Sequence, residues 1–330
     1  MPRASDLEEE LVTSVQSLAS ARSLLEGESE ASSHFLAATS RLPVSNLGYW
    51  ERTIRNELAW AVGRRISLNV WSRKKLSGPW LHLFNGSGYQ REEALDAITD
   101  GAPSAFLFAI MLRRLNDWVP EVRETARESV KRNALRTEAE VVVDALWGTL
   151  PYLHSWGRWQ EREREALVNL VCIGNVPELL AARIVQSSSG PAATVLSQAA
   201  RAPAIDRFLT NIAHHSIQPA VRAKAYKIAL DEQASWLEDR KWVWKDKYWG
   251  KGRYEPVLGT RILSVSADRL SLLRDAAMDK SPAVRRIAGA TIIARLAELG
   301  EEALPLAKLL AADVYPSIAE RGQFALDRIT

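Results

Sequence analysis

Residues 236–256 hold the densest group of side chains in this sequence that could bind another molecule. The 21 residues WLEDRKWVWKDKYWGKGRYEP combine six aromatic with six cationic side chains, namely Trp236, Trp242, Trp244, Tyr248, Trp249, Tyr254, Arg240, Lys241, Lys245, Lys247, Lys251 and Arg253. Aromatic faces interleaved with lysine and arginine can stack on nucleic-acid bases and neutralise phosphates. The same residue types are enriched at the hot spots of protein interfaces.

Three interpretations of this segment stay open. It could bind a protein, it could bind a nucleic acid, or its tryptophans could pack back onto the body of the protein while the lysines extend into water. Of the two binding interpretations we favour a protein contact. The predicted partner-binding residues are Trp242, Trp244, Lys245, Lys247, Tyr248, Trp249, Lys251 and Arg253.

A second basic cluster is a weaker candidate for binding a polyanion. Its members are Arg64, Arg65, Arg73, Lys74 and Lys75. Cations at the C-terminal end of a helix complement the helix dipole without any ligand, so a solvated helix end is the favoured interpretation. If the cluster lay on the same side as residues 236–256, the two together would form a track for a polyanion.

The sequence predicts no catalytic set, metal site or cofactor. The only cysteine, Cys172, excludes an intrachain disulfide and a cysteine-based zinc cage, and we expect a buried, inert thiol. His214 and His215 would point about 100° apart on a helix, which does not suit one metal. A Trp-lined pocket near Tyr152 is conceivable and would favour an enzyme, but core packing of Trp147, Trp156 and Trp159 is the favoured interpretation.

Composition excludes few classes of protein. With 330 residues and 47% hydrophobic content, the chain can bury a core without disulfides. Residues 1–30 carry seven carboxylates and two arginines, so the net charge of +3 divides into −5 there and +8 in the rest. No run of 18 apolar residues occurs, and the N-terminal residues lack the pattern of a signal peptide. We therefore expect a cytoplasmic protein that does not contact a membrane.

Helical periodicity dominates the elements that must position these residues. Ile54, Leu58, Ala61, Val62 and Ile66 recur at spacings of three and four, which places them on one helix face. No segment shows sustained alternation of apolar and polar residues. The sequence therefore predicts an all-α protein.

One helix-start motif recurs along the chain. Asp117–Arg123 reads Asp-x-x-Pro-x-Val-Arg and is followed by Ala126. Complete or partial copies begin at other turns, at Asn85–Arg91, Pro219–Arg222, Asp279–Arg285 and Asp313–Ile318. Aspartate caps exposed amides and proline suits the first helical turn, so each copy predicts the start of a helix.

This pattern resembles the HEAT-repeat family, whose units carry Asp-x-x-Pro-x-Val-Arg-x-x-Ala across the turn between paired helices. The resemblance implies a right-handed α-solenoid of HEAT-like helix pairs that acts as a scaffold. It also implies that Arg91, Arg123, Arg222 and Arg285 pair with turn carboxylates inside the stack. The arginine could reach its own aspartate or that of the neighbouring repeat.

The spacing of the motif gives the expected domain organisation. The motif arginine stands at positions 91, 123, 222 and 285, and Ala319 takes its place in the last copy. The steps between these positions are 32, 99, 63 and 34 residues. They are close to one, three, two and one times a period of about 33 residues. We expect an N-terminal helical cap region at 1–45, HEAT-like repeats at 46–235 that are degenerate in the middle, a Trp/Lys-rich insertion at 236–256, and C-terminal HEAT-like repeats at 257–330.

The predicted function is that of a non-catalytic scaffold or adaptor. It would bind a protein partner through its concave surface and the aromatic, basic insertion. The alternative is a nucleic-acid-binding HEAT-like protein, similar to the HEAT-like DNA glycosylases at the level of the fold alone.

Overall fold

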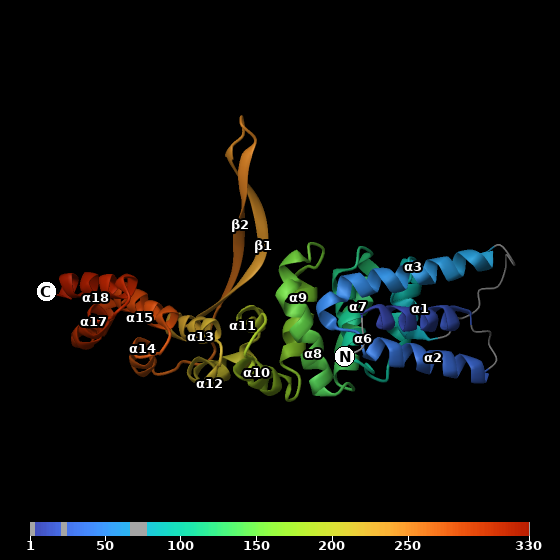
Figure 1. The fold of residues 1–330 in the computed structure, drawn as a ribbon, viewed down its shortest axis with the longest axis horizontal. Helices are drawn as coiled ribbons and strands as arrows, with labels where there is room; N and C mark the ends of the chain where they lie inside the picture. Colours follow the sequence, from blue (N-terminus) through green and yellow to red (C-terminus); the bar gives the residue numbers. More distant parts are fainter. Residues whose placement is uncertain (1–3, 21–24, 67–77, 330) are drawn as a thin grey trace. The chain divides into compact units, whose positions relative to one another are not determined.

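The chain forms two compact units, Met1–Val176 and Pro177–Thr330. The computed structural model describes residues 4–20, 25–66 and 78–329 (Figure 1). Helices predominate in both units, and each unit is described separately.

The first unit contains nine α-helices and three 3₁₀ turns in its described residues. The helices are α1 (Ala4–Ser20), α2 (Leu25–Ser40), α3 (Leu47–Ile66), α4 (Pro79–His82), α5 (Gly88–Ala97), α6 (Ala105–Arg113), α7 (Pro120–Ala134), α8 (Ala139–Thr149) and α9 (Glu161–Val171). The 3₁₀ turns are η1 (Val44–Asn46), η2 (Arg114–Asn116) and η3 (Leu150–Ser155).

Helix α6 lies at the centre of the first unit. Every residue from Phe106 to Leu112 is buried, because a helix that is apolar on all sides must be covered on all sides. Helices α2, α3, α7 and α8 pack against it, and α7 also packs between α5 and α9. Helices α5, α7 and α9 thus form one layer of the stack, and α6 and α8 belong to the other.

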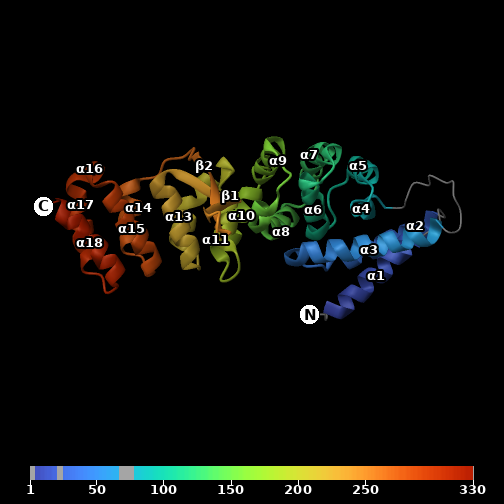
Figure 2. The same cartoon turned by 90° about the horizontal axis from the view of Figure 1, so that it is seen from above.

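The second unit repeats the same arrangement of helix pairs. Its helices are α10 (Val176–Gln186), α11 (Ala192–Ala199), α12 (Leu209–His215), α13 (Pro219–Asp231), α14 (Arg269–Ala277), α15 (Pro282–Ala294), α16 (Leu296–Leu299), α17 (Ala303–Ala311) and α18 (Pro316–Ile329), with 3₁₀ turns η4 (Pro203–Phe208) and η5 (Gly300–Glu302). Pairs α12–α13, α14–α15 and α17–α18 pack internally, while α11, α13, α15 and α18 pack in succession (Figure 2). This is the helix stacking of an α-solenoid.

Arg91, Arg222 and Arg285 of the recurring motif bind the aspartate of the next motif copy. Arg123 differs, because it donates to the carbonyl of Asp117 in its own copy at 2.8 Å. Arg222 donates two hydrogen bonds to Asp279, at 2.9 and 3.0 Å, and a third to the Ser216 carbonyl at 3.0 Å. Arg285 binds Asp313 in the same bidentate manner. Each aspartate also accepts the backbone N–H two residues further on, which closes the turn before its helix. The expectation of a structural arginine ladder is confirmed for these pairs, and the partner is the neighbouring repeat.

One segment contradicts the all-α prediction. Strands β1 (Gln233–Asp246) and β2 (Lys251–Ile262) form an antiparallel hairpin that extends away from the helices of the second unit (Figure 1). The expected insertion at 236–256 lies within this hairpin, which starts three residues earlier and ends six residues later. Tryptophan, tyrosine and valine favour strands, and the segment holds no helical stripe that could be buried.

The hairpin also corrects the expected repeat count. The 63-residue step from Arg222 to Arg285 contains the 30 residues Gln233–Ile262, which leaves 33 for a single repeat instead of two. The 99-residue step from Arg123 to Arg222 contains α9 and α11, whose fourth residues are Arg164 and Val195. Three helix pairs therefore occupy it, as the period predicts.

Candidate functional site

Strand pairing sorts the side chains of the hairpin onto two faces. Trp242 pairs with Tyr254, Trp244 with Gly252, and Leu237 with Leu258, so these residues share one face. We call its exposed apolar members the aromatic face: Trp242, Trp244, Tyr254, Pro256 and Leu258. Their side chains remain accessible, with Trp244 at 50% and Tyr254 at 65% exposure.

The rings of the aromatic face are held by one another. The Trp242 ring lies 5.4 Å from the Trp244 ring and 5.0 Å from the Tyr254 ring, both edge to face. Gly252 makes room for this cluster, because a Cβ there would lie 2.6 Å from the Trp242 ring. The cluster is preformed, so little side-chain entropy is left to lose when it is covered.

Most cations lie away from the aromatic face, and Arg240, which pairs with Pro256, lies on it. Lys241, Val243 and Arg253 are on the opposite face, where Arg253 forms an ion pair with Glu255 at 2.7 Å. Lys245 lies at the register shift between Trp244 and Asp246. The sequence-predicted residues are therefore brought onto one hairpin, but their aromatic and basic members do not interleave on one surface.

The turn of the hairpin carries a separate aromatic pair. Asp246 Oδ1 accepts the backbone N–H groups of Tyr248 and Trp249 at 3.0 and 3.1 Å, and Gly250 has a φ of +62°. Tyr248 and Trp249 are exposed, with ring centroids 5.2 Å apart. The predicted residues Lys247, Tyr248 and Trp249 thus form the tip.

Polar contacts fix the base of the hairpin to the helices. Arg261 donates to both oxygens of Asp206, at 2.9 and 2.5 Å, and to the carbonyl of Ala202 at 3.0 Å. The Asp206 carboxylate is fully buried and also accepts from Ser264. Ser197 Oγ donates to the Ser235 carbonyl at 2.8 Å. These anchoring residues were not predicted, since their sequence context resembles ordinary helix ends.

Trp236 is the one aromatic residue of the segment that packs back onto the helices. It lies on the face opposite Trp242, over the Arg201 guanidinium at 4.9 Å from the ring centroid, and its Nε1 donates to Glu238 at 2.6 Å. A Cβ on Gly259 would collide with its ring. Packing back is therefore the correct interpretation for Trp236, whereas Trp242, Trp244 and Trp249 are exposed.

The second basic cluster is only partly described. Arg64 and Arg65 fall in the last turn of α3, in the first unit. Arg73, Lys74 and Lys75 lie outside the described residues. A polyanion track that joins this cluster to the hairpin stays a prediction.

The aromatic and histidine residues that the sequence also singled out have partners within the protein. Trp156 and Trp159 are buried and pack edge to face at 5.4 Å, as core packing predicts, and Trp156 also lines a cavity beside Tyr152. His214 Nε2 lies 3.1 Å from Asp275 Oδ2, and His215 pairs with Asn211, so the two rings have different partners. Within the described residues, no group of three or more His, Cys, Asp or Glu side chains is placed to hold a metal.

The expectation for Cys172 is wrong. Its side chain is exposed at the C-terminal end of α9. The buried face of that helix is formed by Leu167, Leu170 and Val171. The residue after Val171 is turned away from this face, because successive helical residues point about 100° apart.

Comparisons with known proteins do not assign a family. No protein-family model matches the sequence, and no curated protein matches it. Among solved structures, a designed armadillo repeat protein is similar over 76% of this chain and 98% of its own, with 14% sequence identity and a TM-score of 0.24. A TM-score this low does not establish a common fold, and the stacked helix pairs rest on the packing described above.

No single helix in the described part of the chain is long and apolar enough to cross a bilayer. Helices α9 and α10 meet the criteria of length and composition only as a bent pair.

Proposed function

We propose that this chain is a HEAT-like scaffold, a right-handed solenoid that docks a protein partner on the aromatic face of its hairpin. The observation that carries the proposal is the exposed cluster of Trp242, Trp244 and Tyr254 on an arm anchored by Arg261 and Asp206. Tryptophan and tyrosine dominate the binding energy of protein interfaces because they bury large areas at a small entropic cost. An arm with a fixed base presents them in one orientation.

The partner in this proposal carries an acidic surface. Residues 240–254 contain six cations and one carboxylate, so the arm beyond its base has a net charge of +5. Opposite charges on two partners accelerate encounter and fix their relative orientation, while apolar contacts supply most of the affinity. We therefore expect an apolar patch bordered by carboxylates on the partner.

A nucleic acid fits this geometry less well than a protein. Base stacking requires open ring faces with cations beside them. The Trp242 ring instead has two edge-to-face neighbours, Trp244 and Tyr254. The register places Arg240 on the same face, but Lys241 and Arg253 lie on the other face of the hairpin.

The non-catalytic character of the scaffold is part of the same proposal.

Photo-crosslinking from two adjacent positions tests the proposal. Leu258 and Val257 are both exposed apolar residues, but Leu258 belongs to the aromatic face and Val257 to the opposite one. A photoreactive amino acid at position 258 is expected to capture an acidic protein in cell extract, and the same amino acid at position 257 is expected to capture little of it.

The captured protein is then purified and its affinity measured by calorimetry. We expect the double substitution Trp242→Ala with Trp244→Ala to abolish binding, and an increase in salt to weaken it. Equal capture from both positions, or capture of nucleic acid alone, would contradict the proposal.

A further inference from the structure

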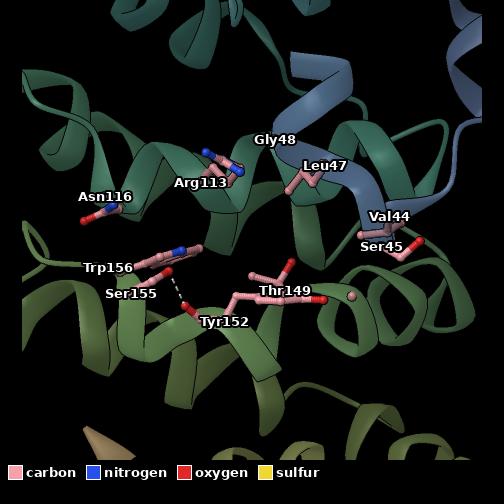
Figure 3. A pocket seen from close by; sticks show the side chains of 11 residues that line it. Val44, Ser45, Leu47, Gly48, Arg113, Asn116, Thr149, Tyr152, Ser155 and Trp156 are labelled. Carbon is pink, nitrogen blue, oxygen red and sulfur yellow. Dashed lines mark hydrogen bonds between the residues drawn. The ribbon is translucent and has the colours of Figure 1, made fainter. Parts of the chain in front are cut away.

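A cavity of about 290 Å³ lies in the first unit, where α3, α6 and η3 meet (Figure 3). Arg113 faces Tyr152 and Trp156 across it, and the other polar side chains of its lining are Ser45, Asn116, Thr149 and Ser155. This volume is close to the lower limit of pockets that bind small molecules. The cavity is independent of the hairpin, which belongs to the second unit.

Two polar side chains of the cavity, Arg113 and Asn116, offer hydrogen-bond donors to it. The Arg113 guanidinium can only donate, and its Nε is already bound to Glu51 Oε2 at 2.9 Å. Asn116 Oδ1 accepts the backbone N–H of Arg158 at 2.8 Å, so the amide NH₂ remains as its free function. A ligand that accepts hydrogen bonds suits this lining.

Thr149 supplies a second, independent indication of a ligand. Its side chain is only 3% exposed, and its Oγ1 has no hydrogen-bond partner in the described part of the chain. The hydroxyl points toward the cavity (Figure 3). The buried hydroxyl of Thr39, in contrast, donates to the Phe35 carbonyl at 2.8 Å. A buried hydroxyl without a partner is costly unless something binds to it.

The charges behind the cavity favour an anion. Glu51 is shared by three guanidinium groups, those of Arg55, Arg113 and Arg114. Burial lowers the pKa of Arg113, and repulsion from Arg114 and Arg55 lowers it further, although the attraction of Glu51 opposes both. An anion beside Arg113 would compensate this excess of positive charge.

We propose that this cavity binds a small organic anion. The carboxylate of the ligand accepts hydrogen bonds from Arg113 and Thr149, and its flat apolar part lies against Trp156 and Tyr152. Arginine is suited to this role because its planar guanidinium matches a carboxylate in geometry.

Fluorine NMR titration with 4-fluorobenzoate and its neutral analogue 4-fluorobenzamide tests the proposal. We expect saturable binding of the benzoate. The benzamide is expected to bind at least about tenfold more weakly. Arg113→Gln and Thr149→Val are each expected to weaken benzoate binding by about tenfold. Thr149→Val removes no hydrogen bond from the free protein, so this variant is expected to fold.

Arg127→Gln serves as the matched control. Arg127 forms an ion pair with a buried glutamate, Glu163, at 2.6 Å, but it does not line the cavity. We expect this variant to bind the benzoate as the wild type does. Equal binding of benzamide, no binding of benzoate at millimolar concentration, or unchanged affinity in both cavity variants would overturn the proposal.

Discussion

Burial distinguishes otherwise similar arginine–aspartate pairs in the stack. Arg91 and Asp117 are 2% and 3% exposed, and Asp117 also binds the buried Arg114. Arg285 and Asp313 form the same bidentate contact at 15% and 6% exposure. The sequence predicted the role of these arginines, but the motif alone could not decide between the aspartate of the same repeat and that of the next.

The cost of removing one carboxylate should follow this burial. Asp117→Asn leaves the buried Arg91 without its carboxylate and Arg114 with Glu51 alone, so we expect a loss of about 3–5 kcal/mol in the free energy of unfolding. Asp313→Asn leaves the more exposed Arg285 and is expected to cost about 1–2 kcal/mol. Urea denaturation measures both values. A larger loss in Asp313→Asn would contradict this account.

The same carboxylates predict how stability depends on pH. Burial alone would raise the pKa of Asp117, but the hydrogen bond from Arg91 and the charge of Arg114 lower it below its ordinary value of 3.8. The pKa values of Glu51 and Asp313 are lowered as well. Because the unfolded chain binds protons more readily, these groups stabilise the fold above their unfolded pKa values, and this contribution is lost as pH falls through the folded ones. Thermal denaturation should show a smaller loss in Asp117→Asn than in the wild type on acidification below about pH 4. An equal loss would contradict the assignment.

The hairpin is the element that the sequence did not predict. Trp236, Trp242 and Trp244 have the same parity, yet the register shift between Leu237 and Asp239 places Trp236 on the opposite face. Beyond its base neither face is buried, so no apolar–polar alternation was required. The available signals were the alternation of Trp242 with Trp244 and the turn from Asp246 to Gly250.

Gly252→Val tests the packing of the aromatic face. The added side chain would collide with the Trp242 ring and separate it from its neighbours. We expect a changed near-ultraviolet circular dichroism spectrum with an unchanged far-ultraviolet spectrum and little change in stability. Gly157→Ala is the control, because a Cβ there meets no atom within 4 Å. Identical near-ultraviolet spectra for Gly252→Val and the wild type would contradict the ring geometry.

The helix stack should fold without the hairpin. The Leu263 N–H donates to the Glu232 carbonyl at 3.0 Å, so the ends of the hairpin meet and a short turn can replace residues 233–262. Asp206→Asn accompanies the deletion, because the loss of Arg261 would leave a buried carboxylate without its counterion. We expect cooperative thermal unfolding of a helical protein. A molten or insoluble product would show that the hairpin is part of the fold.

At the scale of the whole molecule, the repeat architecture was predictable where the motif is intact. Arg91, Arg222 and Arg285 mark repeats in both units, and each binds the aspartate of the next motif copy. The central repeats were not recognisable, because α9 starts with a capping box of Gln160 and Glu163 instead of aspartate and proline. The spacing of the motif predicted the number of central repeats, but it did not show which residues form them.

The central claim is that the aromatic face of the hairpin docks an acidic protein. The most direct test compares Trp244→Ala with Val243→Ala, since these neighbours point to opposite faces of β1. For the protein captured from position 258, we predict that Trp244→Ala weakens binding by about 2 kcal/mol, roughly thirtyfold, in calorimetry. Val243→Ala should change the affinity by less than about threefold. Equal effects of the two substitutions, or none from Trp244→Ala, would contradict the claim.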